Sequence, residues 1–175
     1  EHASVALRAR REVKLTALAS SPLEDAGTQT VTAQLVLVGG ATKLENAITV
    51  ELAQVAGGTA EAADHDFSAT RTLSFAAGAV DGATDSTDVA ITDYTFVEGD
   101  ETLLLQLQNV TTLDGQVTID ADNDEYTLTI VDNDTAQVKL TVKNRYFVFE
   151  LGAVSDPDIE EAVIGGLAVD LSKHT

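Results

Sequence analysis

The alternation of apolar and polar residues is the clearest pattern in this chain. Apolar side chains recur at every second position in several short runs, with polar or smaller neighbours between them. Period-two runs that are rich in Val, Ile, Leu and Thr predict half-buried β-strands. The runs lie at residues 31–37, 48–52, 73–75, 89–91, 103–107 and 126–130.

Glycine-containing pairs separate these runs and predict turns between the strands. The region from residue 13 to residue 134 shows no apolar stripe with helical spacing. Many short strands joined by glycine-rich turns predict an all-β fold, an antiparallel β-sandwich. The predicted turns are Gly39-Gly40, Gly57-Gly58, Ala77-Gly78, Asp81-Gly82 and Asp114-Gly115.

The two ends of the chain differ from the middle. Residues 5–18 read as a strand region, interrupted by arginines at Arg8, Arg10 and Arg11 that we expect to form an exposed, solvated patch. After Asp134 the alternation resumes at residues 138–142 and 146–150, which predicts further strands.

Residues 155–161 have the features of a helix start, with Asp156 as the cap and Pro157 at the first helical position. Gly165-Gly166 weakens such a helix, so a loop leading to a strand at residues 167–171 is the alternative. The many apolar residues after Asp134 are too numerous for a flexible linker, and we expect them to be buried against something.

Composition limits the classes of protein that this chain can represent. Its 175 residues suffice for one sandwich domain of roughly 100 residues and additional segments. No apolar run approaches the ~20 residues that span a bilayer, so we expect no membrane insertion. The absence of Cys excludes disulfides and thiolate metal sites. A chain that begins with Glu1 and contains no Met reads as a mature or excised segment.

The negative charge is concentrated in the middle of the chain. Residues 15–135 contain two basic side chains, Lys43 and Arg71, and 21 acidic ones, which gives −19. The two ends together contain eight basic and eight acidic residues and are neutral. Such a surface repels nucleic acid and anionic membranes and attracts divalent cations, although it also fits a purely solubilising role.

Two acidic segments are expected to meet at one end of the sandwich. The first is residues 93–101 and the second is residues 129–134. The strand that starts near Glu101 runs away from the first segment, and the strand at residues 126–131 returns beside it. Crowded carboxylates are costly unless a cation offsets their charge, and calcium takes six to eight oxygen ligands.

These segments also carry a family resemblance, which extends over about residues 12–134. Val97-Glu98-Gly99-Asp100-Glu101 and Ile130-Val131-Asp132-Asn133-Asp134, in this order, resemble motifs of the Calx-beta domains. Leu23-Glu24-Asp25-Ala26-Gly27 and Asp64-His65-Asp66-Phe67 fit the same pattern. The resemblance implies an immunoglobulin-like antiparallel β-sandwich that binds calcium at one end.

Carried over position by position, the resemblance implies six carboxylate ligands for calcium and a seventh, Asn133, as a candidate carbonyl ligand. Tyr94 stands where calcium-binding members often have a second Asp, so one carboxylate is missing. The segment before Asp64 is also one residue short, so Asp66 is an alternative to Asp64. A solvated acidic rim without metal is the competing interpretation. The implied ligands are Glu24, Asp64, Asp93, Glu98, Asp132, Asn133 and Asp134.

Other candidate sites are weaker. Residues 120–125 resemble a calcium loop in composition, but they lack its Gly and Glu spacing and read as a solvated hairpin loop. His65 is expected to pack in the domain rather than to bind a transition metal. No Ser, His and Asp set with a nucleophile elbow is present, so we expect no enzyme.

Together these patterns predict an N-terminal segment at residues 1–11, a sandwich at 12–134 and a C-terminal extension, or the start of a further module, at 135–175. The predicted function is a calcium-binding structural or adhesive module of a secreted or cell-surface protein. The alternative is a subunit of a self-assembling extracellular filament. In that case the terminal segments would dock onto a protein partner or onto neighbouring subunits.

Overall fold

The computed structural model describes residues 10–40, 42–113, 117–143, 146–152, 161–164 and 167–170, with side chains from Arg11 to Val138. The predicted turn at Asp114-Gly115, Arg8, the predicted helix start at 155–160 and Gly165-Gly166 lie outside these residues. All the elements up to residue 130 are strands except one short 3-10 turn. They are β1 (Arg10–Leu15), β2 (Ala19–Ser20), η1 (Glu24–Ala26), β3 (Thr28–Val38), β4 (Ile48–Gln54), β5 (Thr70–Phe75), β6 (Thr84–Ala90), β7 (Glu101–Thr111), β8 (Thr118–Ile119) and β9 (Glu125–Ile130).

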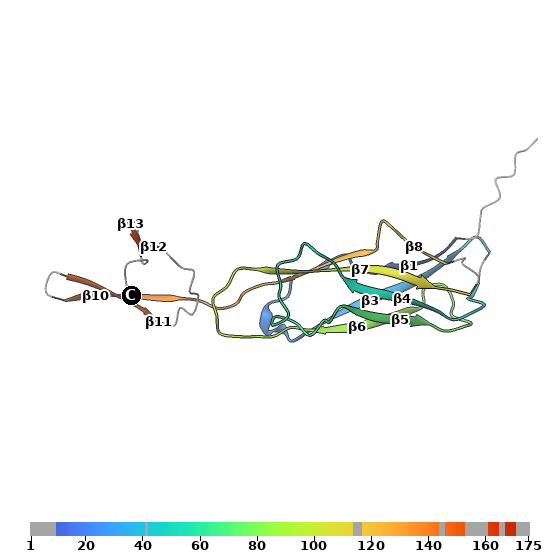
Figure 1. The fold of residues 1–175 in the computed structure, drawn as a ribbon, viewed down its shortest axis with the longest axis horizontal. Coiled ribbons are helices and arrows are strands. Elements are labelled where there is room, and N and C mark those ends of the chain that lie inside the picture. Colours follow the sequence, from blue (N-terminus) through green and yellow to red (C-terminus); the bar gives the residue numbers. More distant parts are fainter. Residues whose placement is uncertain are drawn as a thin grey trace, which may run out of the picture. The chain divides into compact units, whose positions relative to one another are not determined.

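The chain divides into two compact units. One comprises Glu1–Asp93 with Asp100–Val131 and is called here the sandwich unit; the other comprises Tyr94–Gly99 with Asp132–Thr175 and is called the terminal unit. The sandwich unit holds a four-stranded sheet in the order β6-β3-β1-β8 and a five-stranded sheet in the order β2-β9-β7-β4-β5 (Figure 1). The predicted all-β sandwich is confirmed, with antiparallel main ladders and two short parallel pairs.

The core lies between the two sheets and follows the alternation in the sequence. Along β3 every second side chain is buried, from Val31 to Leu37, while the residues between them face outward. The same holds for Leu103, Leu105 and Leu107 on β7. Removing a Leu or Val side chain from water stabilises the fold by roughly 1.5–3 kcal/mol, so these rows supply much of the folding free energy. Three aromatic residues, Phe67, Phe75 and Tyr126, complete the core.

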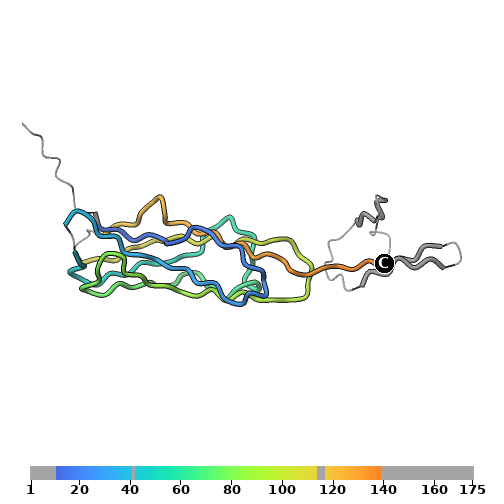
Figure 2. The backbone as a smooth tube through the Cα atoms, turned by 180° about the vertical axis from the view of Figure 1, so that it is seen from behind, coloured from blue at the N-terminus to red at the C-terminus, as the bar shows by residue number. Residues whose placement is uncertain are grey.

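The start of the chain crosses from one sheet to the other. Val13 pairs in parallel with Ile119 of β8, Ala19 pairs with Thr127 of β9, and Leu23 forms a bridge with Val131. Residues 13–23 therefore run beside residues 119–131 along the sandwich, blue beside orange in Figure 2. The predicted strand region at residues 5–18 is thus divided from Arg10 onward, because the chain changes sheets after Leu15, and residues 5–9 lie outside the described residues.

The outer strands β5 and β6 close one side of the sandwich through side chains. Asp85 Oδ2 on β6 accepts a hydrogen bond from Ser74 N on β5 at 2.7 Å. Arg71 on β5 donates to the carbonyl oxygen of Asp88 and, at 3.3 Å, to Thr87 Oγ1. The outward N–H of Ser74, which would otherwise be open to another strand, is thereby satisfied.

The terminal unit contains two hairpin-like sheets. β10 (Gln137–Lys143) pairs with β11 (Tyr146–Gly152) over seven residue pairs, and β12 (Glu161–Ile164) pairs with β13 (Leu167–Asp170) over four. The strands predicted at 138–142 and 146–150 are confirmed. At residues 167–170 the strand alternative is found, and residues 161–164 form its antiparallel partner.

Candidate metal centre

Backbone pairing fixes the position of Glu24 at one end of the sandwich. The Glu24 N–H donates to the carbonyl oxygen of Val131 at 3.0 Å, and the Val131 N–H donates to that of Pro22 at 2.9 Å. Glu24 then begins the 3-10 turn η1, which ends at Gly27 with a φ of 78°. The side chain of Glu24 is buried, with 5% of its surface exposed. A buried carboxylate at the end of a sheet is costly unless positive charge or donors reach it.

The residues that follow Val131 form a compact turn around the carboxylate of Asp132. Asp132 Oδ1 accepts a hydrogen bond from Asp134 N at 2.7 Å, and Oδ2 accepts one from Glu98 N at 2.8 Å. Both oxygens of Asp132 therefore hold the backbone of neighbouring segments. The family resemblance predicts Asp132 as a ligand, and the two hydrogen bonds show a structural role, which is to tie residues 98 and 134 together.

Three carboxylates lie close enough to share one cation. One oxygen each of Glu24, Asp132 and Asp134 lies within 4.8 Å of the others. Asp134 Oδ2 is buried and has no hydrogen-bond partner among the described residues. Like charges at this separation repel, so the arrangement lowers its free energy when a cation enters. We call these three residues the acidic cluster.

The other predicted ligands lie outside the acidic cluster. The side chains of Asp93, Glu98 and Asn133 are exposed, and Glu98 contributes its backbone N–H to Asp132. Asp64 is buried, and its carboxylate accepts a hydrogen bond from Glu61 N within a tight turn. The structure thus brings together three of the seven predicted ligands, and metal binding by any of the seven stays a prediction.

Asp66, the alternative to Asp64, is engaged by a cation of the protein itself. Its Oδ1 lies 2.8 Å from Arg71 Nη2 and accepts a hydrogen bond from Ala90 N at 2.8 Å. Partial burial raises the pKa of Asp66, but the Ala90 hydrogen bond and the Arg71 guanidinium outweigh this effect, and the pKa lies below its usual value. Arg71 also lies over the ring of Phe67 at 4.9 Å. Asp66 therefore stabilises this loop through its contacts with Arg71 and Ala90.

His65 packs inside the sandwich. Its side chain is 5% exposed, its Nδ1 accepts a hydrogen bond from Phe67 N at 3.2 Å, and residue 65 forms a bridge with Ile91. Within the described residues no group of three metal-ligating side chains includes His65. These contacts agree with the packing role predicted for it.

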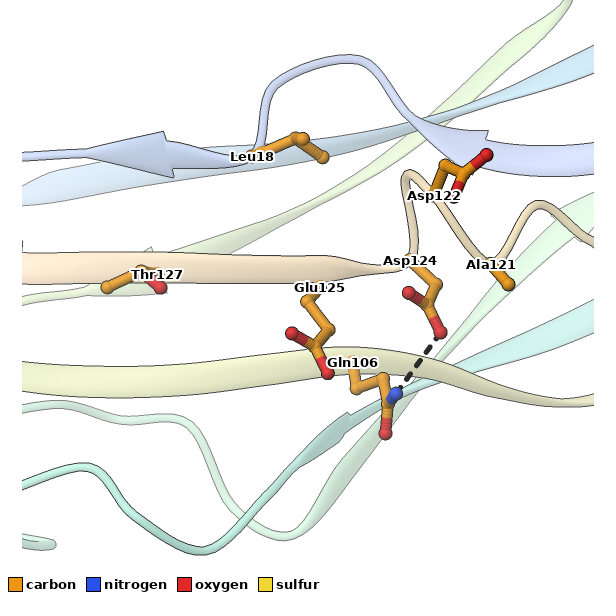
Figure 3. A pocket seen from close by; sticks show the side chains of 7 residues that line it. All are labelled: Leu18, Gln106, Ala121, Asp122, Asp124, Glu125 and Thr127. Carbon is orange, nitrogen blue, oxygen red and sulfur yellow. Dashed lines mark hydrogen bonds between the residues drawn. The ribbon is translucent and has the colours of Figure 1, made fainter.

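The acidic segment at residues 120–125 lines a separate depression. The depression has a volume of about 470 Å³, and the Gln106 amide donates a hydrogen bond to Asp124 Oδ2 at 3.1 Å. Figure 3 shows Asp122, Asp124 and Glu125 around it. The segment is not a hairpin loop as predicted, because β8 before it and β9 after it belong to different sheets. Acidic side chains alone do not define a metal site, and none of them belongs to the acidic cluster.

Comparison with known proteins shows which solved structures share this fold. No family model matches the chain, and no curated protein matches it. Among solved structures, the apo-form Calx CBD1 domain matches with a TM-score of 0.58 at 19% identity, over 71% of this chain and 99% of that chain. The Calx CBD2 domain matches with a TM-score of 0.55 at 12% identity, over 72% of this chain and 90% of that chain.

A two-domain structure gives the same picture. The calcium binding domain CBD12 of CALX1.1 matches with a TM-score of 0.56 at 18% identity, over 73% of this chain and 49% of that chain. These identities are low, so they establish the fold and leave the ligands to be argued from the residues. The predicted resemblance to the Calx-beta domains is confirmed at the level of the fold.

Proposed function

We propose that the chain is a calcium-binding structural or adhesive module of a secreted or cell-surface protein, and a binding protein rather than an enzyme. The observation that carries this proposal is the acidic cluster, in which three carboxylate oxygens lie within 4.8 Å of one another. The similarity to a structure described as a calcium binding domain supports the choice of ion.

The donor set of the acidic cluster suits calcium. Calcium binds oxygen ligands at 2.3–2.6 Å, so two ligands on opposite sides of one ion are at most about 5 Å apart. The three carboxylate oxygens lie within 4.8 Å of one another, which falls within that span. Glu24, Asp132 and Asp134 would hold the ion, and the buried Asp134 Oδ2 would gain a partner. Sulfur and imidazole ligands, which zinc and copper prefer, are absent from the acidic cluster.

Within the chain, the acidic cluster connects elements that are distant in sequence. Glu24 is fixed by Val131, and Asp132 holds the backbone of Glu98 and Asp134. Offsetting the three charges would make these connections more stable, which is how a domain without disulfides can gain stability. This role is mechanical, because the residues bind and orient segments and transfer no proton or group.

The extracellular context is part of the proposal. Extracellular modules bind calcium with dissociation constants of roughly 10⁻⁴–10⁻³ M. Among the described residues no helix is long and apolar enough to cross a membrane. The alternative, a subunit of an extracellular filament, is favoured by the strands of the terminal unit, which form only two-stranded sheets within the described residues. The size of the protein in solution distinguishes a single module from a filament.

Isothermal titration calorimetry of the full chain, stripped with chelator and titrated with calcium, tests the proposal. We expect saturable binding, and thermal stability that rises with calcium concentration because the ion prefers the folded state. Asp132→Ala combined with Glu98→Ala should abolish the calcium-dependent rise in melting temperature. Asp122→Asn, in the separate depression, is the matched control and should retain it. A full rise in the double variant, or none in the parent chain, would refute the assignment.

A further inference from the structure

The sandwich unit begins and ends with two segments that run in the same direction. We call residues 10–24 the first segment and residues 118–131 the last segment. They pair in parallel near their starts, where β1 meets β8, and again at their ends, where Leu23 forms a bridge with Val131. The chain therefore enters the sandwich unit at one pole and leaves it at the other, as the blue start and the orange end of this unit show in Figure 2.

Backbone hydrogen bonds connect the two segments along their common length, and we call this row of bonds the parallel interface. β2 and β9 contribute a short parallel pair in its middle, and Tyr126 Oη donates to Ser20 Oγ across it at 2.7 Å. Five more backbone bonds lie on either side of that pair. They run from Asp120 N to Val13 O at 3.0 Å, from Leu15 N to Asn123 O at 2.8 Å, from Thr127 N to Leu18 O at 2.9 Å, from Val131 N to Pro22 O at 2.9 Å and from Glu24 N to Val131 O at 3.0 Å.

Both segments are also held on their other sides. β1 pairs with β3 over six residue pairs, and β9 pairs with β7 over six. Each segment thus lies between two neighbours, and its inward side chains, such as Val13 and Leu128, are fully buried. Neither segment can leave the sandwich unit without breaking the parallel interface or a main ladder.

A pull on the two ends of the sandwich unit loads the parallel interface in shear. The pull draws the first segment back toward the pole where it enters and the last segment toward the pole where it leaves. Hydrogen bonds between strands lie across the strand direction, so this sliding displaces all of them together and they share the load. If the two segments were antiparallel, both ends would lie at one pole, and the bonds would open one after another.

We propose that the sandwich unit bears tension along the chain, and that the parallel interface sets the force at which it unfolds. Forced unfolding is governed by the unfolding rate, and the core between the sheets opens only after one of the two segments has slid away. This inference goes beyond the proposed function and does not require the calcium ion, because main-chain bonds form the parallel interface.

Optical tweezers can pull the full-length chain in two directions through pairs of introduced cysteines, because the chain has no Cys of its own. Glu1→Cys with Thr135→Cys loads the parallel interface in shear. Glu1→Cys with Thr118→Cys pulls on the starts of both segments and opens the same bonds one after another, since Thr118 is exposed and lies opposite Glu12. We call the second direction peeling. Chelator is present throughout, so the result is independent of the acidic cluster.

We expect the unfolding force in shear to be roughly threefold or more above that in peeling at the same loading rate, because at least five backbone hydrogen bonds share the load. Equal forces in the two directions would overturn the proposal, since the parallel interface would then give no directional resistance.

Two matched substitutions in the shear chain test whether the parallel interface limits the unfolding rate. Val13→Ala lies in the first segment, Val89→Ala lies on β6 outside the interface, and both valines are 0% exposed. Val13→Ala should unfold roughly tenfold faster at constant force, because its packing is lost when the first segment slides. Val89→Ala should stay within about twofold of the shear chain, because its contacts are still in place when the interface breaks.

Urea unfolding shows whether both variants fold and whether they are destabilised to a similar extent. If Val13→Ala does not fold, Tyr126→Phe takes its place, because it removes only the hydrogen bond to Ser20 across the parallel interface. Equal acceleration of forced unfolding by the interface variant and by Val89→Ala would overturn the proposal, since the rate would then depend on the whole core.

Discussion

Asp134→Asn removes one negative charge from the acidic cluster while keeping the size of the side chain. At the 4.8 Å limit of the acidic cluster, each pair of like charges costs between about 0.9 and 3.5 kcal/mol for effective dielectric constants of 80 and 20. Asp134 Oδ2 is buried without a hydrogen-bond partner among the described residues, so the substitution removes repulsion and breaks no described side-chain hydrogen bond. In the presence of chelator, the variant should therefore be at least as stable as the parent chain.

In the presence of calcium, the parent chain should instead be more stable than the Asp134→Asn variant. With a dissociation constant of roughly 10⁻⁴–10⁻³ M, 10 mM calcium stabilises the folded parent chain by about 1.4–2.7 kcal/mol. The variant, which lacks one ligand charge, should gain only a small part of this. Urea unfolding with chelator and with 10 mM calcium measures both free energies, and the matched control is Asp122→Asn. If Asp134→Asn lowers the free energy of unfolding equally under both conditions, Asp134 supports the fold and the argument about the ion is wrong.

Three further substitutions and one control, Gly99→Ala, test the packing and the electrostatics by urea unfolding. Gly58→Ala should cost about 1–3 kcal/mol because its Cβ would meet the carbonyl oxygen of Thr102, whereas Gly99→Ala, with open space, should change little. Ala69→Gly should stabilise the fold by up to about 1 kcal/mol, since Ala69 has a φ of 48°; a loss would contradict that reading of the backbone. Asp66→Asn should cost up to about 1 kcal/mol at neutral pH. The difference in unfolding free energy between the parent chain and the variant is present above pH 3.8, the ordinary pKa of Asp. It should vanish as the pH falls through the lowered pKa of Asp66 in the folded state. A difference that persists at about pH 2 would argue against an ionic contribution.

The strands were predictable because one face of each is buried. Period-two alternation located β3, β4, β7 and β9 within a few residues of their ends. For β6 it found only residues 89–91, whereas the strand begins at Thr84. The missed residues are Thr, Asp and Ser on an outer strand, where side chains such as Asp85 bond the neighbouring strand and hydrophobicity gives no signal.

The candidate site was less predictable than the fold. The sequence motifs identified the carboxylates of the acidic cluster, but they could not show what each carboxylate bonds within the protein. Arg71 forms an ion pair with Asp66, and the backbone N–H of Glu61 donates a hydrogen bond to Asp64. Both contacts depend on loop geometry that alternation does not encode. The path of β8 into the other sheet was missed for the same reason, since a two-residue strand has no period.

The hydrogen bond from Ser74 to Asp85 has a consequence for how such molecules behave when they are crowded. Because the outward N–H of Ser74 is already occupied by the Asp85 carboxylate, a β-strand from another molecule finds no free donor at this position of β5. Molecules held at high local density would therefore be less prone to join their β5 edges into one continuous sheet.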